Sequence, residues 1–385
     1  MTILDLLKLL VEKNGSDLHL IAGLKPAIRI DGKLIPLSEY EALTPDSAQE
    51  LIFAILSDKQ KASFHEDQNS RYELDFAYSV SGLGRFRVNV HKQRGTVAAS
   101  IRALSTEIPK LESLGLPAAV KEFTKAKKGL VLVTGPTGSG KSTTLAAIID
   151  EINATRSDHI LTVEDPIEYL HRSKQSYVTQ REVGPSADTL SFKNALKYAL
   201  RQDPDVILIG EMRDYETIGI AITSAETGHL VLGTLHTASA AQTVGRIIDV
   251  FPAEQQPQVR IQLGSNLVGV ISQVLLPRSD QEGRCVACEL MIANAAVKNN
   301  VRAGKAESLN QIIQTSVAEG MQSLDQSLVK LCQEGKIDAE SALPYVHDKA
   351  TLETLNKYQR AGQSSSASQS SPSPAYSSSS GWGGR

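Results

Sequence analysis

A glycine-rich stretch after a short apolar run has the residue types and spacing of a phosphate-binding loop. It reads Gly135, Pro136, Thr137, Gly138, Ser139, Gly140, Lys141, Ser142 and Thr143. The stretch satisfies the pattern GxxxxGK[ST], in which glycines let backbone N–H groups surround phosphate oxygens. Lys141 is placed to neutralise the β- and γ-phosphates, and Ser142 to offer a hydroxyl to Mg²⁺. These residues predict a site for a nucleoside triphosphate with magnesium.

Three carboxylates follow the apolar run at residues 160–163. They are Glu164, Asp165 and Glu168. Neighbouring carboxylates are costly to place together without a cation, and ligands of parallel sheets bind at the carboxyl ends of the strands. We interpret them as an acidic cluster facing the magnesium and phosphates, with one member activating the attacking water. The alternative is a solvated acidic loop.

The apolar run at residues 206–209 also ends in an acid. It is followed by Gly210 and Glu211, whereas a P-loop enzyme usually has an aspartate at the end of this strand. Glu211 is therefore the acid within reach of the metal, through water. Asp203 and Asp205 precede the run, so we expect them at the opposite end of the strand in turns or caps.

Two histidines flank the apolar run at residues 230–235. His236 and Thr234 lie at its carboxyl end, where they are expected to sense the γ-phosphate or to contact a neighbouring subunit. His229 lies at the start of the run, and both a structural and a functional role remain open for it.

The apolar runs alternate with helix-length segments from about residue 118 onward. This alternation predicts a parallel sheet covered on both faces by helices. After Phe251 the pattern is mostly helical, with one further strand pair near Arg284–Ile292. The fold class is therefore α/β.

The first part of the chain reads as a small α+β unit. Residues 3–12 and 45–65 have helical patterns, Asp31 and Gly32 lie between alternating apolar runs typical of a hairpin, and three strands are expected before residue 105. We divide the chain into an N-terminal domain at 1–106, a linker and hinge at 107–117, an ATPase domain at 118–360, and a disordered Ser/Gly/Pro-rich tail at 361–385.

The composition limits the classes of protein to consider. The chain has 385 residues, 41% of them hydrophobic and 5% aromatic, and a net charge of −3, which gives no overall electrostatic signature for nucleic acid. Three cysteines suit a reducing compartment. No apolar run approaches the ~18–20 residues that cross a bilayer. These features predict a soluble cytosolic protein.

Four motifs in a fixed order resemble the PilT-like ATPases that retract type IV pili. They are GPTGSGKSTT, VEDPIEY, GEMRD and TGHLVLGTLHTASA, and the segments SDLHL and RFRVN extend the similarity over about residues 1–345. The resemblance implies a PAS-like N-terminal domain and a RecA-like ATPase domain with a helical C-terminal part, assembled as a homohexameric motor. It further implies a position at the cytoplasmic base of the pilus machine, against an inner-membrane platform protein, with a paralogous retraction ATPase as a further partner and no nucleic acid.

The resemblance also assigns roles to individual residues. Lys141 and Ser142 correspond to the Walker A residues, Glu168 to the catalytic glutamate, and Glu211 to an atypical Walker B acid. His229 and His236 correspond to the family's histidine box. The arginines that correspond to positions near the nucleotide, some across a subunit boundary, are Arg85, Arg87 and Arg102; the alternative is that these are surface arginines.

Two features keep other interpretations open. The family's AIRNLIRE segment is here AVKNNVRA at residues 296–303, with Lys298 and Asn300 in place of Arg and Leu, so an accessory PilU-like retraction ATPase is the first alternative. A RecA-like DNA-dependent ATPase or helicase is an alternative of another class, and a non-hydrolysing regulatory subunit is a third. Cys285 and Cys288 form only half of a four-ligand zinc site, so no zinc is expected.

Overall fold

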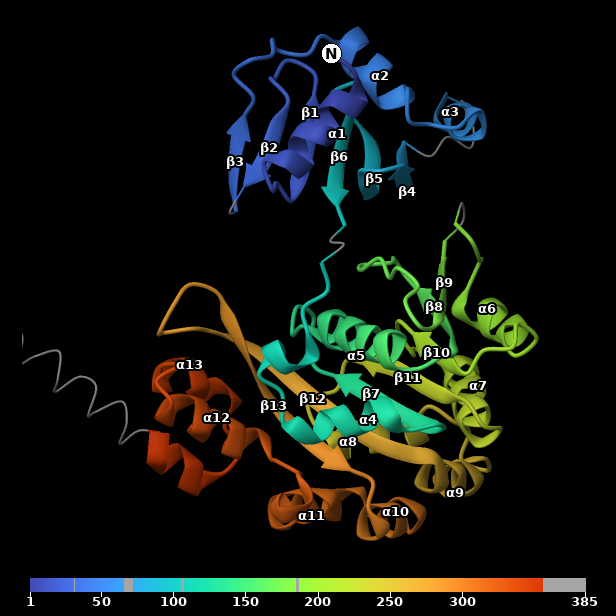
Figure 1. The fold of residues 1–385 in the computed structure, drawn as a ribbon, viewed down its shortest axis with the longest axis vertical. Helices are drawn as coiled ribbons and strands as arrows, with labels where there is room; N and C mark the ends of the chain where they lie inside the picture. Colours follow the sequence, from blue (N-terminus) through green and yellow to red (C-terminus); the bar gives the residue numbers. More distant parts are fainter. Residues whose placement is uncertain (31, 66–71, 105–106, 185–186, 356–385) are drawn as a thin grey trace, which may run out of the picture.

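The computed structural model describes residues 1–30, 32–65, 72–104, 107–184 and 187–355, which form two β-sheets with their helices (Figure 1). The N-terminal unit is drawn in blue at the top of the figure, and the larger unit lies below it. The mixed α/β architecture expected from the sequence is confirmed. The predicted tail at 361–385 lies outside the described residues. No helix among the described residues has the length and apolarity to cross a membrane.

The N-terminal unit is a six-stranded antiparallel sheet in the order β3-β2-β1-β6-β5-β4. Its elements are α1 (Ile3–Glu12), β1 (Asp17–Ile21), β2 (Ala27–Ile30), β3 (Lys33–Pro36), α2 (Pro45–Phe53), α3 (Asp58–His65), β4 (Glu73–Val80), β5 (Gly84–Gln93) and β6 (Thr96–Ala103). Helix α1 begins with a capping box of Thr2 and Asp5 and buries Leu6 and Leu10 in the core of this unit. The predicted hairpin is present as β2 and β3, with Asp31 outside the described residues.

The helical pattern at residues 45–65 is confirmed, and the segment forms two helices instead of one continuous helix. Helix α2 ends at Phe53 and α3 begins at Asp58. The second start has a physical cause in Ser57 and Gln60. The N–H of Ser57 donates to the side chain of Gln60 at 2.9 Å, and the N–H of Gln60 donates to the hydroxyl of Ser57 at 3.4 Å. This reciprocal pair caps a new helix.

The larger unit contains a seven-stranded sheet in the order β13-β12-β7-β11-β10-β8-β9. Its elements up to the last strand are η1 (Leu111–Leu114), η2 (Ala118–Val120), α4 (Lys121–Lys125), β7 (Gly129–Thr134), α5 (Lys141–Thr155), β8 (His159–Glu164), β9 (Tyr177–Glu182), α6 (Phe192–Ala199), β10 (Val206–Ile209), α7 (Tyr215–Glu226), β11 (Leu230–Leu235), α8 (Ala240–Asp249), α9 (Gln256–Asn266), β12 (Leu267–Pro277) and β13 (Arg284–Ile292). All pairings are parallel except that of β12 with β13. The carboxyl ends of β7, β8, β10 and β11 therefore meet at one edge.

Helices cover both faces of this sheet, as the sequence pattern predicts. The side chains of α4 and α5 pack in one core, and those of α6 to α9 pack in another with the helices that follow β13. A further core joins the β12–β13 hairpin to α12 and α13. The elements after β13 are α10 (Ala295–Arg302), η3 (Ala306–Ser308), α11 (Leu309–Thr315), η4 (Val317–Glu319), α12 (Leu324–Gln333), α13 (Ala339–Ala342) and η5 (Leu343–Tyr345).

Strand β9 is an element that the sequence analysis did not anticipate. Its sequence, YVTQRE, has no continuous apolar run, and Tyr177 is 79% exposed. The strand lies at the edge of the sheet and pairs with β8 alone. An edge strand is covered on fewer sides than a central one, so the run that marks buried parallel strands is missing.

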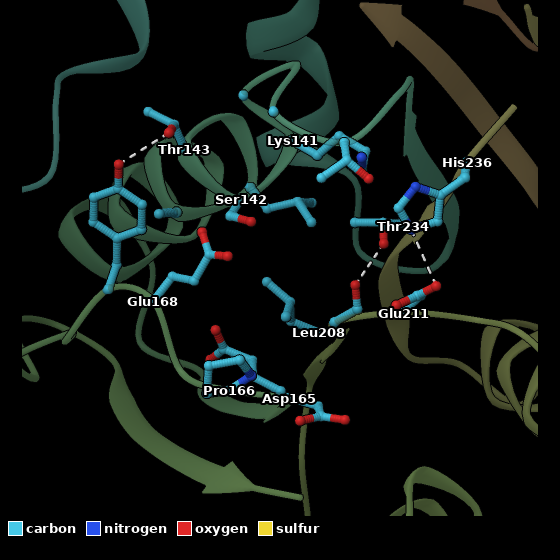
Figure 2. Close-up of a pocket in the computed structure, with 18 of the residues that line it drawn as sticks. Lys141, Ser142, Thr143, Asp165, Pro166, Glu168, Leu208, Glu211, Thr234 and His236 are labelled. Atoms are coloured by element: carbon cyan, nitrogen blue, oxygen red, sulfur yellow. Dashed lines mark hydrogen bonds and ion pairs between the residues drawn. The ribbon is translucent and has the colours of Figure 1, made fainter. Parts of the chain in front are cut away.

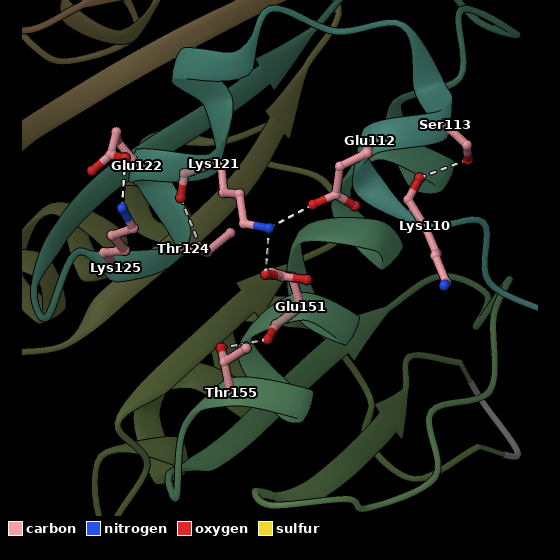
Figure 3. Close-up of polar contacts among 9 residues, drawn as sticks. All are labelled: Lys110, Glu112, Ser113, Lys121, Glu122, Thr124, Lys125, Glu151 and Thr155. Carbon is pink, nitrogen blue, oxygen red and sulfur yellow. Dashed lines mark hydrogen bonds and ion pairs between the residues drawn. The ribbon is translucent and has the colours of Figure 1, made fainter.

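The segment at 107–117, predicted as a linker, contains a part that packs on the larger unit. Leu111 is 6% exposed and belongs to the core beside α5. Figure 3 shows Lys121 between Glu112 and Glu151, with ion pairs to both carboxylates, the second at 3.1 Å. We call this group the Lys121 clip. It joins η1 to α4 and α5, so residues 111–114 of the predicted linker pack on the larger unit. A hinge within 107–117 stays a prediction.

Candidate functional site

The glycine-rich loop joins the buried strand β7 to the start of α5. Gly135, Gly138 and Gly140 have φ angles of 141°, 79° and 89°, a range that side chains with a Cβ rarely adopt. A Cβ on Gly135 would also lie 2.2 Å from the carbonyl oxygen of Gln273. Gly140 is the N-cap of α5 and gives it no side-chain cap, so N–H groups at this helix end stay available for a phosphate.

Lys141 lies across the loop. Its Nζ donates to the carbonyl oxygens of Gly135 and Pro136, both at 2.9 Å. Burial lowers the pKa of Lys141, and the charges of Glu211 and Glu168 act in the opposite direction. Both acids are therefore close enough to interact with this ammonium group, and the three charged groups belong to one site (Figure 2).

A buried glutamine of β12 holds the glycine-rich loop through hydrogen bonds. Gln273 is 2% exposed; its amide nitrogen donates to the carbonyl oxygen of Ser139 at 2.7 Å, and its amide oxygen accepts from Thr144 at 2.9 Å. Beside it, the hydroxyls of Thr134 and Ser272 lie 2.7 Å apart. The loop is thus tied to the neighbouring strand by satisfied, buried hydrogen bonds, which hold its shape.

Glu211 at the end of β10 is paired with two cationic or titratable neighbours. Its carboxylate lies 2.6 Å from Arg213 and 3.1 Å from Nε2 of His236. The hydrogen bond from Arg213, together with the contact to His236, outweighs burial and holds the pKa of Glu211 below its usual range. The site therefore carries an ionised carboxylate at this position, the chemical requirement for a magnesium ligand or for orienting a metal-bound water.

Gly210 directly follows β10, where P-loop enzymes usually have an aspartate, and a side chain at this position would be crowded. A Cβ on Gly210 would lie 3.1 Å from Cα of Glu164 and 3.2 Å from the carbonyl oxygen of Val163. These distances are shorter than ordinary van der Waals contacts. Thr234 of β11 donates its hydroxyl to the carbonyl of Gly210, which joins the ends of the two strands.

The three acids after β8 have different surroundings. Glu164 accepts from Thr162 at 2.6 Å and from Gln180 at 3.2 Å, and burial raises its pKa. Asp165 and Glu168 are exposed, and both line the cavity beside the glycine-rich loop. The predicted acidic cluster therefore divides into one partly buried, hydrogen-bonded acid, Glu164, and two exposed acids, and all three line the cavity. Among these, Glu168 interacts with Lys141.

Two adjoining cavities lie at this edge of the sheet. The first, about 360 Å³, is lined by Lys141, Ser142, Glu168, Glu211, His236 and neighbouring residues (Figure 2). The second, about 790 Å³, is lined by parts of η1, β12, β13 and α12. The two share Gly140, Thr143, Leu275 and Arg284. An extended ligand with a phosphate tail can therefore occupy both.

Other predicted site residues lie away from these cavities in the single chain. His229 is at the start of β11, where Nδ1 lies 3.0 Å from the carbonyl oxygen of Ser224. Asp205 lies at the same end and accepts from the N–H of His159, which agrees with its predicted structural role. A role in catalysis for His229 stays a prediction.

The three predicted arginines lie on strands of the N-terminal unit and have different surroundings. Arg102 donates to Asp17 at 2.8 Å within that unit. Arg85 donates to Glu182 of β9 at 3.1 Å, a contact between the two units. Arg87 is exposed and lines the small cavity beside this ion pair. Their predicted approach to a nucleotide stays a prediction.

Cys285 and Cys288 lie on opposite faces of β13, as their odd spacing predicts. Cys288 belongs to the core beside α5, whereas Cys285 packs against the core of α12 and α13. Burial raises the pKa of Cys288 to about 12, which keeps the thiol protonated. Among the described residues no three or more His, Cys, Asp or Glu side chains gather into a metal site.

Sequence reasoning missed Gln273 and Arg284. Gln273 lies between the apolar residues of a strand and carries no motif of its own; its partners Ser139 and Thr144 are 134 and 129 positions away. Arg284 is the first residue of the strand expected near 284–292, and it lines both cavities. Only the fold brings these side chains to the loop.

Comparison with known proteins identifies the family. Residues 67–367 match the family described as Type II/IV secretion system protein. The chain belongs to this family. It is 47% identical over 342 residues to the type IV pilus retractation ATPase PilT of Pseudomonas aeruginosa, covering 89% of this chain and 97% of that protein. To the type IV pilus ATPase PilU of the same organism it is 41% identical over 352 residues, covering 91% and 90%.

Solved structures agree with this family membership. A crystal structure of the pilus retraction motor PilT with bound ADP has a TM-score of 0.84 and 48% identity, covering 92% of this chain and 99% of that one. The ATPase DotB of Legionella pneumophila has a TM-score of 0.71 at 28% identity, covering 89% and 95%. The resemblance to PilT-like ATPases predicted from four motifs is confirmed.

Proposed function

We propose that this chain is an ATP-hydrolysing motor subunit that powers retraction of type IV pili. The observation that carries the proposal is the convergence of Lys141, Ser142, Glu168 and Glu211 on one cavity. The similarity to PilT over most of both chains supports retraction as the work performed. ATP is the substrate, with its phosphates on the loop and its nucleoside in the adjoining cavity.

The donor set fits a magnesium ion that arrives with the nucleotide. Mg²⁺ is usually held by one or two protein oxygens together with substrate phosphates and waters. Ser142 supplies the hydroxyl and Glu211 the ionised carboxylate, acting directly or through water. When bound, the ion neutralises charge on the phosphates.

Glu168 is proposed as the base that orients and deprotonates the attacking water. It is exposed to the cavity and close enough to Lys141 to affect that group's pKa. Glu164, with its raised pKa and two donors, is better suited to hold the loop. His236 is proposed to respond to the presence of the γ-phosphate through its contact with Glu211.

The contact between the two units supports coupling of hydrolysis to motion. Glu182, 7% exposed, accepts from Arg85 and lies 3.5 Å from the N–H of Ile167, next to Glu168. A shift of the N-terminal unit therefore acts on the loop that bears the proposed base. ATP biases such a shift only by binding one arrangement better than the other.

The finer parts of the proposal concern assembly and location. The subunit acts as a homohexamer, with a PAS-like N-terminal domain, a RecA-like ATPase domain and Arg85, Arg87 or Arg102 near a nucleotide, some across a subunit boundary. It works at the cytoplasmic base of the pilus, against the inner-membrane platform protein and with a paralogous retraction ATPase.

A PilU-like accessory role is the second candidate. It is favoured by Lys298 and Asn300 in α10, the helix at the position of the family's AIRNLIRE segment. The 41% identity to PilU is compatible with this role, although the identity to PilT is higher, at 47%. A principal motor and an accessory motor differ in what their loss does to the cell.

The test combines a deletion strain with purified protein. If the chain is the principal motor, deletion yields many pili and no twitching, and the wild-type gene restores movement while Lys141→Ala does not. Piliated cells that still move with reduced force indicate the accessory role. The proposal fails if purified Lys141→Ala hydrolyses MgATP at the wild-type rate.

A further inference from the structure

The loop between β11 and α8 is held in place by contacts from three other parts of the chain. At its start, Nε2 of His236 lies 3.1 Å from Glu211. In its middle, the hydroxyl of Thr237 lies 2.6 Å from that of Thr243. At its end, the N–H of Ala240 donates to Glu289 of β13 at 2.7 Å. The third contact comes from a residue that the site described above does not include.

Glu289 is a buried acid with few compensating contacts. It is 8% exposed, and burial raises its pKa, with Ala240 and His347 acting to lower it and Asp325 to raise it. Burying a carboxylate costs free energy that a hydrogen bond offsets only in part. Glu289 does not line either of the two adjoining cavities, so contact with a nucleotide does not explain why a carboxylate is buried here.

Helix capping alone does not explain this acid. Helix α8 already has its own N-cap, Ser239, whose hydroxyl accepts from Gln242 at 3.2 Å. Glu289 lies on β13 and accepts from the N–H of Ala240, the first residue of α8. Its contact therefore fixes the start of the helix relative to the sheet. Ala240 is four positions after His236, and the short loop between them transmits this restraint.

We infer that Glu289 is a positioning residue for ATP hydrolysis, which holds His236 against Glu211 by fixing the first N–H of α8 to β13. This inference rests on the proposed function. The same strand pairs with the segment before α12, through Leu290 and Gln322. The position of His236 is thereby tied to the helices at the end of the chain.

The experiment is a double-mutant cycle on the full-length protein, measured as kcat and KM for MgATP. Glu289→Ala is expected to lower kcat by about tenfold with a change in KM below about threefold. Glu289→Gln keeps an oxygen acceptor and should retain most of the activity. In a His236→Ala background, Glu289→Ala should have less than about a twofold further effect, because the residue it positions is already gone.

A second variant removes the same bond from the other side. Ala240→Pro deletes the N–H, and proline is tolerated at the first position of a helix, where Ser239 with φ −147° and ψ 162° already has the conformation that precedes a proline. It should reproduce the loss of kcat and also have no further effect without His236. This variant keeps the inference testable if Glu289→Ala does not fold.

The matched control is Asn294→Ala, which removes the side chain that caps α10 by accepting from Val297 at 2.9 Å. It should leave kcat within about twofold in both backgrounds.

The inference is overturned if Glu289→Ala or Ala240→Pro lowers kcat by the same factor with and without His236, or leaves kcat unchanged. Failure of the proposed function would instead show as wild-type protein that does not hydrolyse MgATP. In that case the same double-mutant cycle is measured by nucleotide binding. The quantity compared is the ratio of the dissociation constants for MgADP and for a non-hydrolysable MgATP analogue, and an effect that depends on His236 supports the inference while an effect that does not depend on it, or no effect, overturns it.

Discussion

The two sides of the nucleotide cavity are built differently. On the phosphate side, the glycine-rich loop lines the cavity with backbone groups, and Gln273 fixes the loop through buried hydrogen bonds. On the acidic side, Asp165 and Glu168 are exposed and line the cavity, and Glu211 is paired with Arg213 and His236. The proposed phosphate binding benefits from a fixed shape. The proposed proton transfer on the acidic side instead requires side chains that can change partners.

The largest effect is expected on the acidic side, from Glu168→Gln. The amide keeps the size of the side chain but cannot accept the proton of the attacking water, so kcat should fall by about 10²- to 10⁴-fold. The dissociation constant for MgADP should change little, since the loop is intact. Steady-state hydrolysis and calorimetric binding measure the two quantities.

Asp165→Asn is the control for that assignment, because Asp165 lines the same cavity. It should cost less than about tenfold in kcat. A larger loss for Asp165→Asn than for Glu168→Gln would move the base to Asp165 and contradict the assignment.

On the phosphate side, Gln273→Ala is expected to weaken binding more than the chemical step. The change leaves the carbonyl of Ser139 and the hydroxyl of Thr144 without their buried partner, at about 1–3 kcal/mol each. Affinity for MgADP should fall by at least about tenfold, and the thermal unfolding midpoint should drop by several degrees.

Asn153→Ala is the matched control, because it also removes a buried side-chain amide but one that does not bond the glycine-rich loop. Asn153 is a fully buried amide of α5 that bonds Arg172 and Lys174 rather than the loop. It should reduce the unfolding midpoint without a tenfold loss of affinity for MgADP. Equal losses of affinity in both variants would show that Gln273 acts through general stability alone.

The smallest expected effect is a pH dependence of stability from His171. This imidazole lines the cavity near the acidic loop, and burial lowers its pKa to about 4, with Asp150 acting in the opposite direction. The unfolded chain, with a histidine pKa of about 6.5, binds more protons than the folded chain as the pH falls, so this contribution to stability declines from about pH 6.5 toward pH 4. At ~1.4 kcal/mol per pKa unit the limit is about 3 kcal/mol, and partial solvent screening reduces it.

Urea unfolding of wild type and His171→Gln across this range measures the contribution. The wild type should lose more stability on acidification than the variant. Curves that stay parallel from pH 7 to pH 4.5 would contradict the lowered pKa.

Local patterns accounted for much of the fold and of the candidate site. Lys141 and Ser142 were predictable because the loop motif is contiguous, and Glu211 and His236 because each directly follows an apolar run that forms a parallel strand. The break between α2 and α3 was visible in the sequence as Ser57 and Gln60, a capping pattern that the helical periodicity concealed.

The remaining features depend on tertiary structure. Gln273 and Glu289 bond segments far away in the sequence, and Arg284 lines cavities formed by such segments. Nothing in their immediate neighbours marks these residues. Arg85 was noticed, but its partner Glu182 lies on β9, an edge strand without an apolar run. Such residues become visible only once strand order and register are known.

The Lys121 clip also limits how far the motor's two parts can travel. With Leu111 anchored and β6 ending at Ala103, the connecting chain consists of residues 104–110. At a maximum of about 3.5 Å per residue this tether spans roughly 25 Å. A power stroke that keeps this ion-pair group closed can move the N-terminal unit no further than the length of this connecting chain allows.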